Sequence, residues 1–427
     1  MSRAWISLAV FALCYLLFVI FPKRRSWTAC AGGALLIATG ALDWEVALFN
    51  KINWNVMGLF FGTLILAEIF MLSRVPAVIA EWLVDRARSV GGAMLALCAL
   101  SGFISMFAEN VAVVLLIAPV ALSLADKLKI NPVPLLIGIA VSSNLQGTAT
   151  MIGDPPSMIL AGYLRLGFWD FFVYQGRFGI FFAVQVGAIA SLLVLGLLFR
   201  GLRAGETMAP LAQERARSWA PAFLLIVLIV GLSFSTIIDP AFKWFSGTFT
   251  LVLGLIDALW FLITARWGRL RDLARALDWD TTFFLIGVFV LVGGLSDSGW
   301  LDQLAQLISA SVGSSAPLAF SAIVVFSVIV SGFVDNVPFL LAMIPVVQKV
   351  AGGINAPLPL LMFALLIGSC LGGNLMPIGA SANIVTLGIL KKRGHPVGFG
   401  EFMRIGVPFT LAAVVTASLF VWWVWGG

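Results

Sequence analysis

Hydrophobic runs long enough to cross a bilayer recur along the whole chain. A transmembrane helix needs about 20 mostly apolar residues to cross roughly 30 Å of hydrocarbon. The runs alternate with short polar connections from the first residues to the last, which predicts an all-α polytopic membrane protein with about 10 transmembrane helices. The expected spans lie near residues 4–22, 28–48, 54–72, 132–166, 177–199, 218–236, 246–264, 279–297, 358–390 and 402–425.

Four apolar segments depart from the pattern of a simple span. Segments 132–166 and 358–390 are too long for one span and contain Gly, Pro and Asn in their middles, which predicts two broken helices. Segments 90–126 and 315–350 each have an acidic residue followed by Asn at the centre of otherwise apolar sequence. Each fits a re-entrant hairpin, which enters the membrane and leaves it on the same side.

These departures repeat at an offset of 226 residues. The offset aligns Glu109-Asn110 with Asp335-Asn336 without a gap, and it gives 16 identities between residues 101–162 and 327–388. The matches include Asn, Pro and Gly, which a chance similarity between apolar segments does not explain. We therefore predict an N-terminal repeat over 1–199, a cytoplasmic linker over 200–217 and a C-terminal repeat over 218–427.

The basic residues predict that the two repeats have opposite orientations in the membrane. With a cytoplasmic linker, the expected spans place 20 of the 26 Lys and Arg on the cytoplasmic side, as the positive-inside rule requires. The amphipathic segment 75–88 and its flank contain Arg74, Arg86 and Arg88, whereas the equivalent segment 298–314 has no Lys or Arg. Inverted repeats with broken helices characterise many secondary transporters.

Composition narrows the class of protein and of partner. Hydrophobic residues make up 61% of the chain and charged residues 11%, against about 25% charged residues in soluble domains. The net charge of +6 comes from basic residues in connections between spans, so the expected partner is the lipid bilayer and not a nucleic acid. The chain is expected in the cell (inner) membrane of a prokaryote. The four cysteines have no metal-ligand spacing, and no metal or cofactor is expected.

The sequence has no phosphate-binding loop and no soluble domain that could hold one, so we expect a transporter and not an enzyme. Energy for transport would come from a gradient of H+, or of Na+, or from a partner ATPase subunit. A homodimer is also left open.

The strongest candidate site residues lie at the hairpin tips and the helix breaks. Polar groups at membrane depth are costly and tend to face protein or a cavity, and unwound backbone is tolerated there only under the same conditions. The candidates for binding a small inorganic substrate are Asn110, Ser143, Asn144, Gly147, Thr148, Asn336, Gly373, Asn374, Ser381 and Asn383.

Three acids are candidates for ion coupling: Glu109, Asp154 and Asp335. Glu109 and Asp335 each precede an ascending helix, so capping of that helix is the alternative interpretation. Asp154 has no acidic counterpart, because Ala380 occupies the equivalent position.

Four other residues are weaker candidates. Asp257 and Glu68 lie in expected spans where a neighbouring helix could satisfy them, and His395 lies in a basic aqueous segment. Cys370 adjoins the second broken helix and is interpreted as a small buried residue, although trivalent arsenic prefers sulfur ligands.

The motifs resemble the ion transporter superfamily, which includes arsenite/antimonite permeases, sodium/proton antiporters, silicon efflux carriers, the pigmentation P protein and divalent-anion/sodium symporters. The resemblance covers most of the chain. It is carried by Phe107-Ala-Glu-Asn-Val, Ser143-Asn with Ile-Gly-Asp-Pro-Pro156, Val334-Asp-Asn-Val-Pro338, and Gly372-Gly-Asn with Ile-Gly-Ala-Ser-Ala-Asn383.

Departures from the divalent-anion symporters narrow this resemblance. Those symporters usually have Ser-Asn-Thr at both tips, whereas Glu109 and Asp335 would repel a dianion. The leading hypothesis is therefore proton-coupled efflux of arsenite or antimonite, since arsenous acid is neutral near pH 7. A sodium/proton antiporter, a permease for a small oxyanion or carboxylate, and a passive channel remain as alternatives.

Overall fold

Helices dominate the computed structural model, which describes residues 3–21, 24–87, 89–200, 215–264 and 270–427. The first half contains α1 (Arg3–Ile20), α2 (Arg25–Ala38), π-helix η2 (Val46–Lys51), α3 (Trp54–Leu72), α4 (Val75–Arg86), α5 (Val90–Ser105), α6 (Asn110–Leu128), α7 (Val133–Gly147), α8 (Pro155–Leu164), 3-10 helix η3 (Phe168–Phe171), strands β1 (Val173–Tyr174) and β2 (Arg177–Phe178), and α9 (Ile180–Phe199). The second half contains α10 (Ala220–Ser233), α11 (Ser235–Ile238), α12 (Phe245–Thr264), α13 (Leu270–Ala276), α14 (Trp279–Asp297), α15 (Trp300–Val312), α16 (Ala316–Ser331), α17 (Asn336–Gly353), α18 (Leu358–Gly372), α19 (Ser381–Lys392) and α20 (Phe399–Trp425).

The predicted all-α class is confirmed. Within the described ranges, eight helical segments have the length and composition to cross a membrane, and α1, α5, α7, α16 and α18 are shorter apolar helices. The expected span 28–48 differs from the observed helices, because α2 ends at Ala38 and η2 follows at Val46. Strands β1 and β2 form a small antiparallel hairpin, with Val173 opposite Phe178, before α9.

The predicted hairpins and breaks have clear boundaries. Helices α5 and α6 form the first hairpin, and α16 and α17 form the second, with tips at residues 106–109 and 332–335. The broken helices are α7 with α8 and α18 with α19. Their breaks span residues 148–154 and 373–380.

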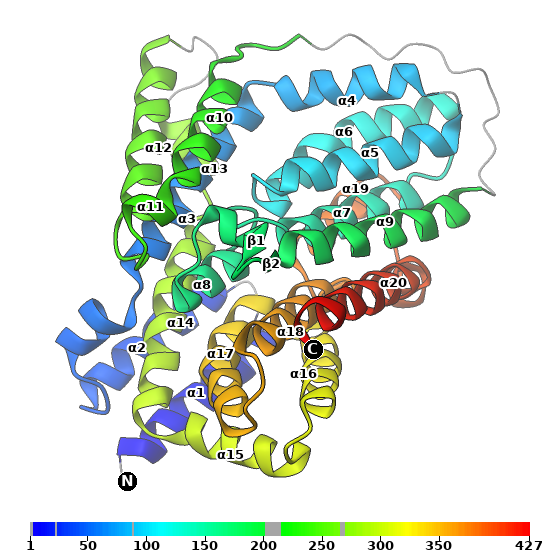
Figure 1. Cartoon of the computed structure of the whole chain (residues 1–427). Helices are drawn as coiled ribbons and strands as arrows, with labels where there is room; N and C mark the ends of the chain where they lie inside the picture. Colours follow the sequence, from blue (N-terminus) through cyan, green and yellow to red (C-terminus); the bar gives the residue numbers. More distant parts are fainter. Residues whose placement is uncertain (1–2, 22–23, 88, 201–214, 265–269) are drawn as a thin grey trace.

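The order of helices from α2 to α9 recurs, with equivalent roles, from α12 to α20. Each series begins with two helices and continues with an amphipathic helix, a hairpin, a broken helix and a final long helix. In the first series α2 has only 14 residues, against 20 in its counterpart α12. The amphipathic helices α4 and α15 lie at opposite ends of the molecule (Figure 1). The boundaries 1–199 and 218–427 stay a prediction, and residues 201–214 of the expected linker lie outside the described residues.

The two halves are interlocked. Helix α3 packs along α12, and α14 packs along α2. The second helix of each series therefore lies against the first helix of the other series. Glycines allow this close approach. A Cβ atom on Gly62 would lie 2.5 Å from the Thr250 backbone, and a Cβ on Gly287 would lie 2.5 Å from the Ala29 backbone.

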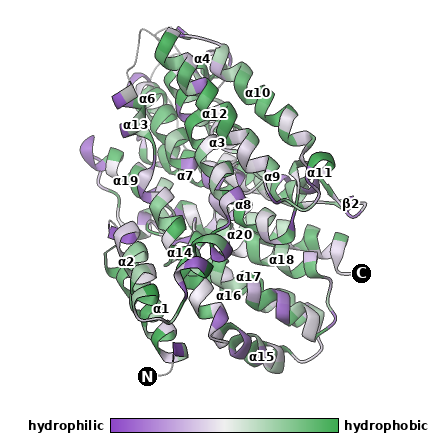
Figure 2. Cartoon of the chain, turned by 90° about the vertical axis from the view of Figure 1, so that its left-hand side faces the viewer, coloured by the Kyte–Doolittle hydropathy of each residue, from purple (hydrophilic) through white to green (hydrophobic). Residues whose placement is uncertain are grey.

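Charged contacts lie at the ends of the helices. Arg393, after α19, is 4.0 Å from Asp126 near the end of α6, while Lys349 of α17 pairs with Asp302 of α15. Hydrophobic residues dominate the outer helices α1, α10 and α12, and hydrophilic residues recur inside the molecule near α7, α8 and α14 (Figure 2). The polar interior is where the hairpin tips meet the helix breaks.

Candidate functional site

Both acids at the hairpin tips cap the helix that follows. A Glu109 carboxylate oxygen accepts a hydrogen bond from the Ala112 N–H at 2.9 Å, and an Asp335 oxygen accepts one from the Val337 N–H at 3.1 Å. Such a bond satisfies a helix N–H that has no partner within the helix. Capping thus explains one oxygen of each acid.

Asp335 also forms an ion pair with Arg25, at the start of α2. The Arg25 guanidinium lies 2.9 Å from an Asp280 carboxylate oxygen and donates to the Thr281 hydroxyl at 2.9 Å. It also lies 4.9 Å from the centre of the Phe284 ring. Arg25 therefore joins the tip of the second hairpin to α2 and α14.

Arg25 is not among the site residues predicted from sequence, because it lies in a basic connection between two expected spans and such connections indicate orientation only. Glu109 has different surroundings, since its electrostatic neighbours are the acids Asp278 and Glu68. The two tips are therefore chemically unlike, although their sequences match.

A network of side-chain amides connects the first hairpin to both broken helices. Asn110 accepts a hydrogen bond from the Ser105 hydroxyl at 2.5 Å and donates to the Asn144 side-chain oxygen at 3.2 Å. Asn144 in turn donates to the Asn374 side-chain oxygen at 3.1 Å, and Asn374 donates to the Val141 carbonyl at 3.0 Å. Three of the predicted site residues thus lie in one chain of hydrogen bonds.

Cys370 lies at the same centre. Its carbonyl oxygen accepts a hydrogen bond from Asn144, 226 residues earlier, at 3.2 Å. Thr148, Asn336 and Asp154 contribute to the electrostatic surroundings of the buried thiol, and the Ser369 hydroxyl lies 3.9 Å from its sulfur. Asn144 and Cys370 are equivalent positions at the repeat offset, so parts of both halves meet here.

Serine hydroxyls attach each hairpin to the broken helix of its own half. Ser143 donates to the Ser105 hydroxyl at 3.0 Å, and Ser331 donates to the carbonyl of Ser369. The four positions correspond at the offset of 226 residues.

The breaks are closed by direct contact between backbone segments. A Cβ atom on Gly153 would lie 2.3 Å from the Gly147 carbonyl oxygen, and a Cβ on Gly379 would lie 2.5 Å from the Gly373 oxygen. Gly147 also allows the Asn110 side chain to approach, since a Cβ there would lie 2.5 Å from its oxygen. Of the predicted site residues, Gly147 and Gly373 thus lie where the backbone or the Asn110 side chain approaches too closely for a larger residue.

Three polar side chains in or next to the breaks retain a buried oxygen without a described partner, those of Thr148, Asp154 and Asn383. Asp154 caps α8 by accepting from the Ser157 N–H at 3.2 Å, but its second oxygen is buried without a partner among the described residues. Asn383 donates to the carbonyls of Gly373 and Met376 at 3.1 and 3.2 Å, and its own oxygen is also buried and unpaired within the described ranges. Ser381 is half-buried at the start of α19 and lies outside this network.

The segments after the breaks cross between the halves. Helix α8 packs against α17 and α18, while α19 packs against α6 and α7. Each hairpin therefore contacts the broken helix of both halves. No group of three His, Cys, Asp or Glu residues in the described part of the chain could hold a metal ion.

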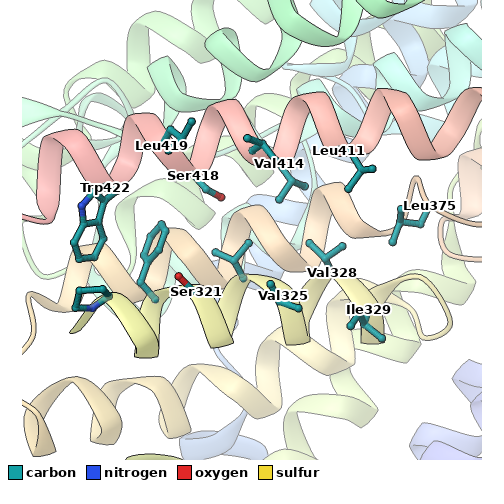
Figure 3. A pocket seen from close by; sticks show the side chains of 14 residues that line it. Ser321, Val325, Val328, Ile329, Leu375, Leu411, Val414, Ser418, Leu419 and Trp422 are labelled. Atoms are coloured by element: carbon teal, nitrogen blue, oxygen red, sulfur yellow. The ribbon is translucent and has the colours of Figure 1, made fainter. Parts of the chain in front are cut away.

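An apolar groove of about 640 Å³ lies between α16 and α20, and Leu375 of the second break is among its lining residues (Figure 3). Val325, Leu411 and Trp422 are among its lining residues, and Ser321 and Ser418 supply hydroxyls. A related groove of about 690 Å³ lies between the equivalent helices α5 and α9. The apolar lining of the first groove suits hydrocarbon and offers no charge to a polar substrate.

Comparison with known proteins decides the family. The profile of the citrate transporter family, CitMHS, matches residues 15–368 and 313–427. The chain belongs to the citrate transporter family. It is therefore a secondary transporter and an integral membrane protein, and not an enzyme.

Relatives of this CitMHS chain are found in bacteria and animals. A 46 kDa membrane protein of Mycobacterium leprae (strain TN) is 29% identical over 98% of both chains. An uncharacterized transporter of Mycobacterium tuberculosis (strain CDC 1551 / Oshkosh) is 28% identical over 98% of both chains. P protein of Homo sapiens is 26% identical over 98% of this chain and 60% of its own length. The predicted superfamily is confirmed.

Two solved transporter structures share the fold. The YdaH transporter of Alcanivorax borkumensis matches 98% of this chain and 97% of its own with a TM-score of 0.61 and 13% identity. MtrF of Neisseria gonorrhoeae, described as illuminating a class of antimetabolite efflux pumps, matches 99% and 95% with a TM-score of 0.52 and 12% identity. At these identities the likeness concerns the fold alone.

Proposed function

We propose that this member of the citrate transporter family is a proton-coupled efflux permease for a small uncharged oxyacid, with arsenite and antimonite as the first candidates. The observation that supports this proposal is the distribution of charged residues at the hairpin tips and helix breaks. The two hairpin tips and two helix breaks contain three acids and no Lys or Arg. Arg25, which approaches one tip, is already paired with the carboxylates of Asp280 and Asp335.

This arrangement favours a neutral solute over a multivalent anion. The amides of Asn110, Asn144 and Asn374 can donate and accept hydrogen bonds, which suits the hydroxyl groups of an undissociated oxyacid. An anion with several charges would find no free Lys or Arg at the tips and breaks, because Arg25 is already paired with Asp280 and Asp335. Arsenous acid needs no such cation because it is uncharged near neutral pH.

Asp154 is the proposed carrier of the counter-proton, with Glu109 as its partner at the first tip. An ionised carboxylate buried without partners is very costly, and such groups are neutralised instead. One oxygen of Asp154 accepts the Ser157 N–H, but the other is buried without a described partner, so a proton on that oxygen would remove the uncompensated charge. Asp335 has a different role in this proposal, because Arg25 already neutralises it.

The test uses purified full-length protein in liposomes with an imposed proton gradient and radiolabelled arsenite. Exchange of a neutral solute for one proton moves a charge, so a membrane potential should change the rate, at about 2.3 kcal/mol per charge per 100 mV. Uptake that depends on the gradient and responds to potential supports the proposal. Absence of gradient-driven uptake of both arsenite and antimonite would falsify the substrate assignment.

A carboxylate permease is the second candidate, favoured by the family description and by Arg25. If Asp335 moved away with its hairpin, Arg25 could bind a substrate carboxylate in its place. Labelled citrate in the same liposomes separates the two candidates. Sodium-dependent pH changes without solute uptake would instead indicate sodium/proton exchange, and dissipation of a gradient without accumulation would indicate a channel.

A further inference from the structure

An acid with no described partner is buried in the contact between two long helices, away from the tips and breaks. Asp257 of α12 has no solvent exposure, and both of its carboxylate oxygens lack a hydrogen-bond partner. The buried residues of α12 are Ser246, Gly247, Thr250, Leu253, Gly254, Asp257 and Phe261. Their spacing of three to four residues places Asp257 on the face that packs against α3.

The three described helices that pack most closely against α12 offer no positive charge. Helix α12 packs mainly against α3, α10 and α11. Glu68 is the sole titratable residue of α3, and α10 and α11 contain none. Gly254 lies against Gly62 and Ile65 of α3, so Asp257, one turn further along, lies level with the turn that contains Glu68.

The equivalent contact in the other half is apolar at this position. Gly62 and Gly287 are equivalent at the offset of 225, and their neighbours across the contact are Thr250 and Ala29. Seven residues after Thr250 stands Asp257, whereas seven residues after Ala29 stands Leu36, which is fully buried. The structure therefore accommodates a leucine at this place in one half, and packing alone does not require an acid in the other.

We propose that Asp257 is a separate proton-binding site, which holds its proton while α3 and α12 are in contact. A charged carboxylate without partners is disfavoured in this contact, and a neutral one can remain. Thr264, the last residue of α12, is exposed and lies about 10 Å further along the helix.

Infrared spectroscopy of the full-length protein in liposomes tests the protonation directly and needs no substrate. Wild type at neutral pH should show a protonated-carboxyl stretch that shifts in D2O, and Asp257→Asn should remove part of it. Asp43→Asn, which changes an exposed acid, should leave it intact. Identical wild-type and Asp257→Asn spectra would overturn the proposal, whatever the transported solute.

Melting temperature as a function of pH supplies the second measurement. An unfolded Asp ionises near pH 3.9, whereas the folded protein keeps the Asp257 proton, so wild-type stability should fall relative to Asp257→Asn as pH rises above that value. Asp257→Leu places at this position the residue found at the equivalent Leu36, and its melting temperature should show the same pH dependence as that of Asp257→Asn. It serves as the second variant if Asp257→Asn fails to fold. A melting difference that does not grow with pH would also overturn the proposal.

Discussion

The side-chain amide of Asn144 donates a hydrogen bond to the main-chain carbonyl of Cys370, which lies 226 residues later and occupies the equivalent position in the second repeat. The two halves therefore touch at equivalent positions, where α7 meets α18. The contact is chemically unequal, since one partner uses an amide side chain and the other its backbone. Substrate contacts at this centre need not be duplicated in the two halves.

We expect the amide network to determine substrate affinity. Asn144→Ala and Asn374→Ala should each weaken apparent affinity about tenfold, since a net hydrogen bond contributes roughly 1 kcal/mol and its unpaired partner adds a penalty. The double variant should lose less than the sum, because both changes remove one shared bond. Concentration-dependent uptake measures this. Asn50→Ala, at an exposed position of η2, is the control, and additive losses would contradict a shared network.

The glycines of the breaks give a matched set of substitutions. Gly153→Ala and Gly379→Ala place a Cβ within 2.5 Å of a backbone oxygen, and overpacking of this kind costs about 1–3 kcal/mol. We expect transport to fall at least tenfold with the protein still inserted. Gly388→Ala in α19 meets no atom within 4 Å and should be neutral. Full activity in Gly379→Ala would show that the break does not need its close backbone contact.

Arg25 should stabilise the second hairpin tip. Arg25→Gln removes charged hydrogen bonds to Asp280 and Asp335, and we expect a loss of about 2 kcal/mol in thermal unfolding together with slower transport. In Arg25→Gln/Asp335→Asn the second change should add little, because the pair is already broken. Arg24→Gln alters an exposed neighbour and serves as control. If the stability losses of the two single variants add fully in the double variant, the Arg25–Asp335 ion pair does not contribute to stability.

Asp154 should determine whether a proton gradient drives transport. Asp154→Asn retains the size of the side chain but cannot release a proton, so gradient-driven accumulation should disappear while exchange of labelled for unlabelled solute continues. Flux assays with and without a gradient measure both. Glu45→Gln, at an exposed position, is the control. Persistent accumulation in Asp154→Asn would transfer the coupling role to another acid.

Asp239, in the connection between α11 and α12, gives a prediction about pH. Burial alone would raise the pKa of this carboxyl. Hydrogen bonds from the N–H groups of Trp244 and Phe245, together with the Lys243 charge, outweigh burial, and the net result is a lowered pKa. Its stabilisation is therefore present above the unfolded pKa of about 3.9 and is lost as pH falls through the folded value. Asp239→Asn keeps an oxygen that can accept these hydrogen bonds but loses the charge near the start of α12, so it should cost about 0.5 kcal/mol at neutral pH and progressively less in acid. A cost independent of pH would exclude the charge as its cause.

Much of the fold could be predicted from sequence because its signals are local. Span length, the glycines of the breaks and the acid-Asn tips each constrain a short segment, and Glu109 and Asp154 lie where such signals place them. The pairing of Arg25 with Asp335 could not be predicted, since 310 residues separate the two and no periodic pattern connects them. Likewise, nothing in the sequence around Cys370 indicates that its carbonyl accepts a hydrogen bond from Asn144.

The crossing of α8 and α19 has a consequence for how such a protein can arise and be divided. Neither half fully covers its own broken helix, because α8 also packs against α17 and α18 of the other half, and α19 packs against α6 and α7. A half produced alone would expose those surfaces to lipid, and a functional ancestor of one repeat would have needed two copies inserted in opposite directions. Co-production of the two halves as separate chains should restore what either one lacks.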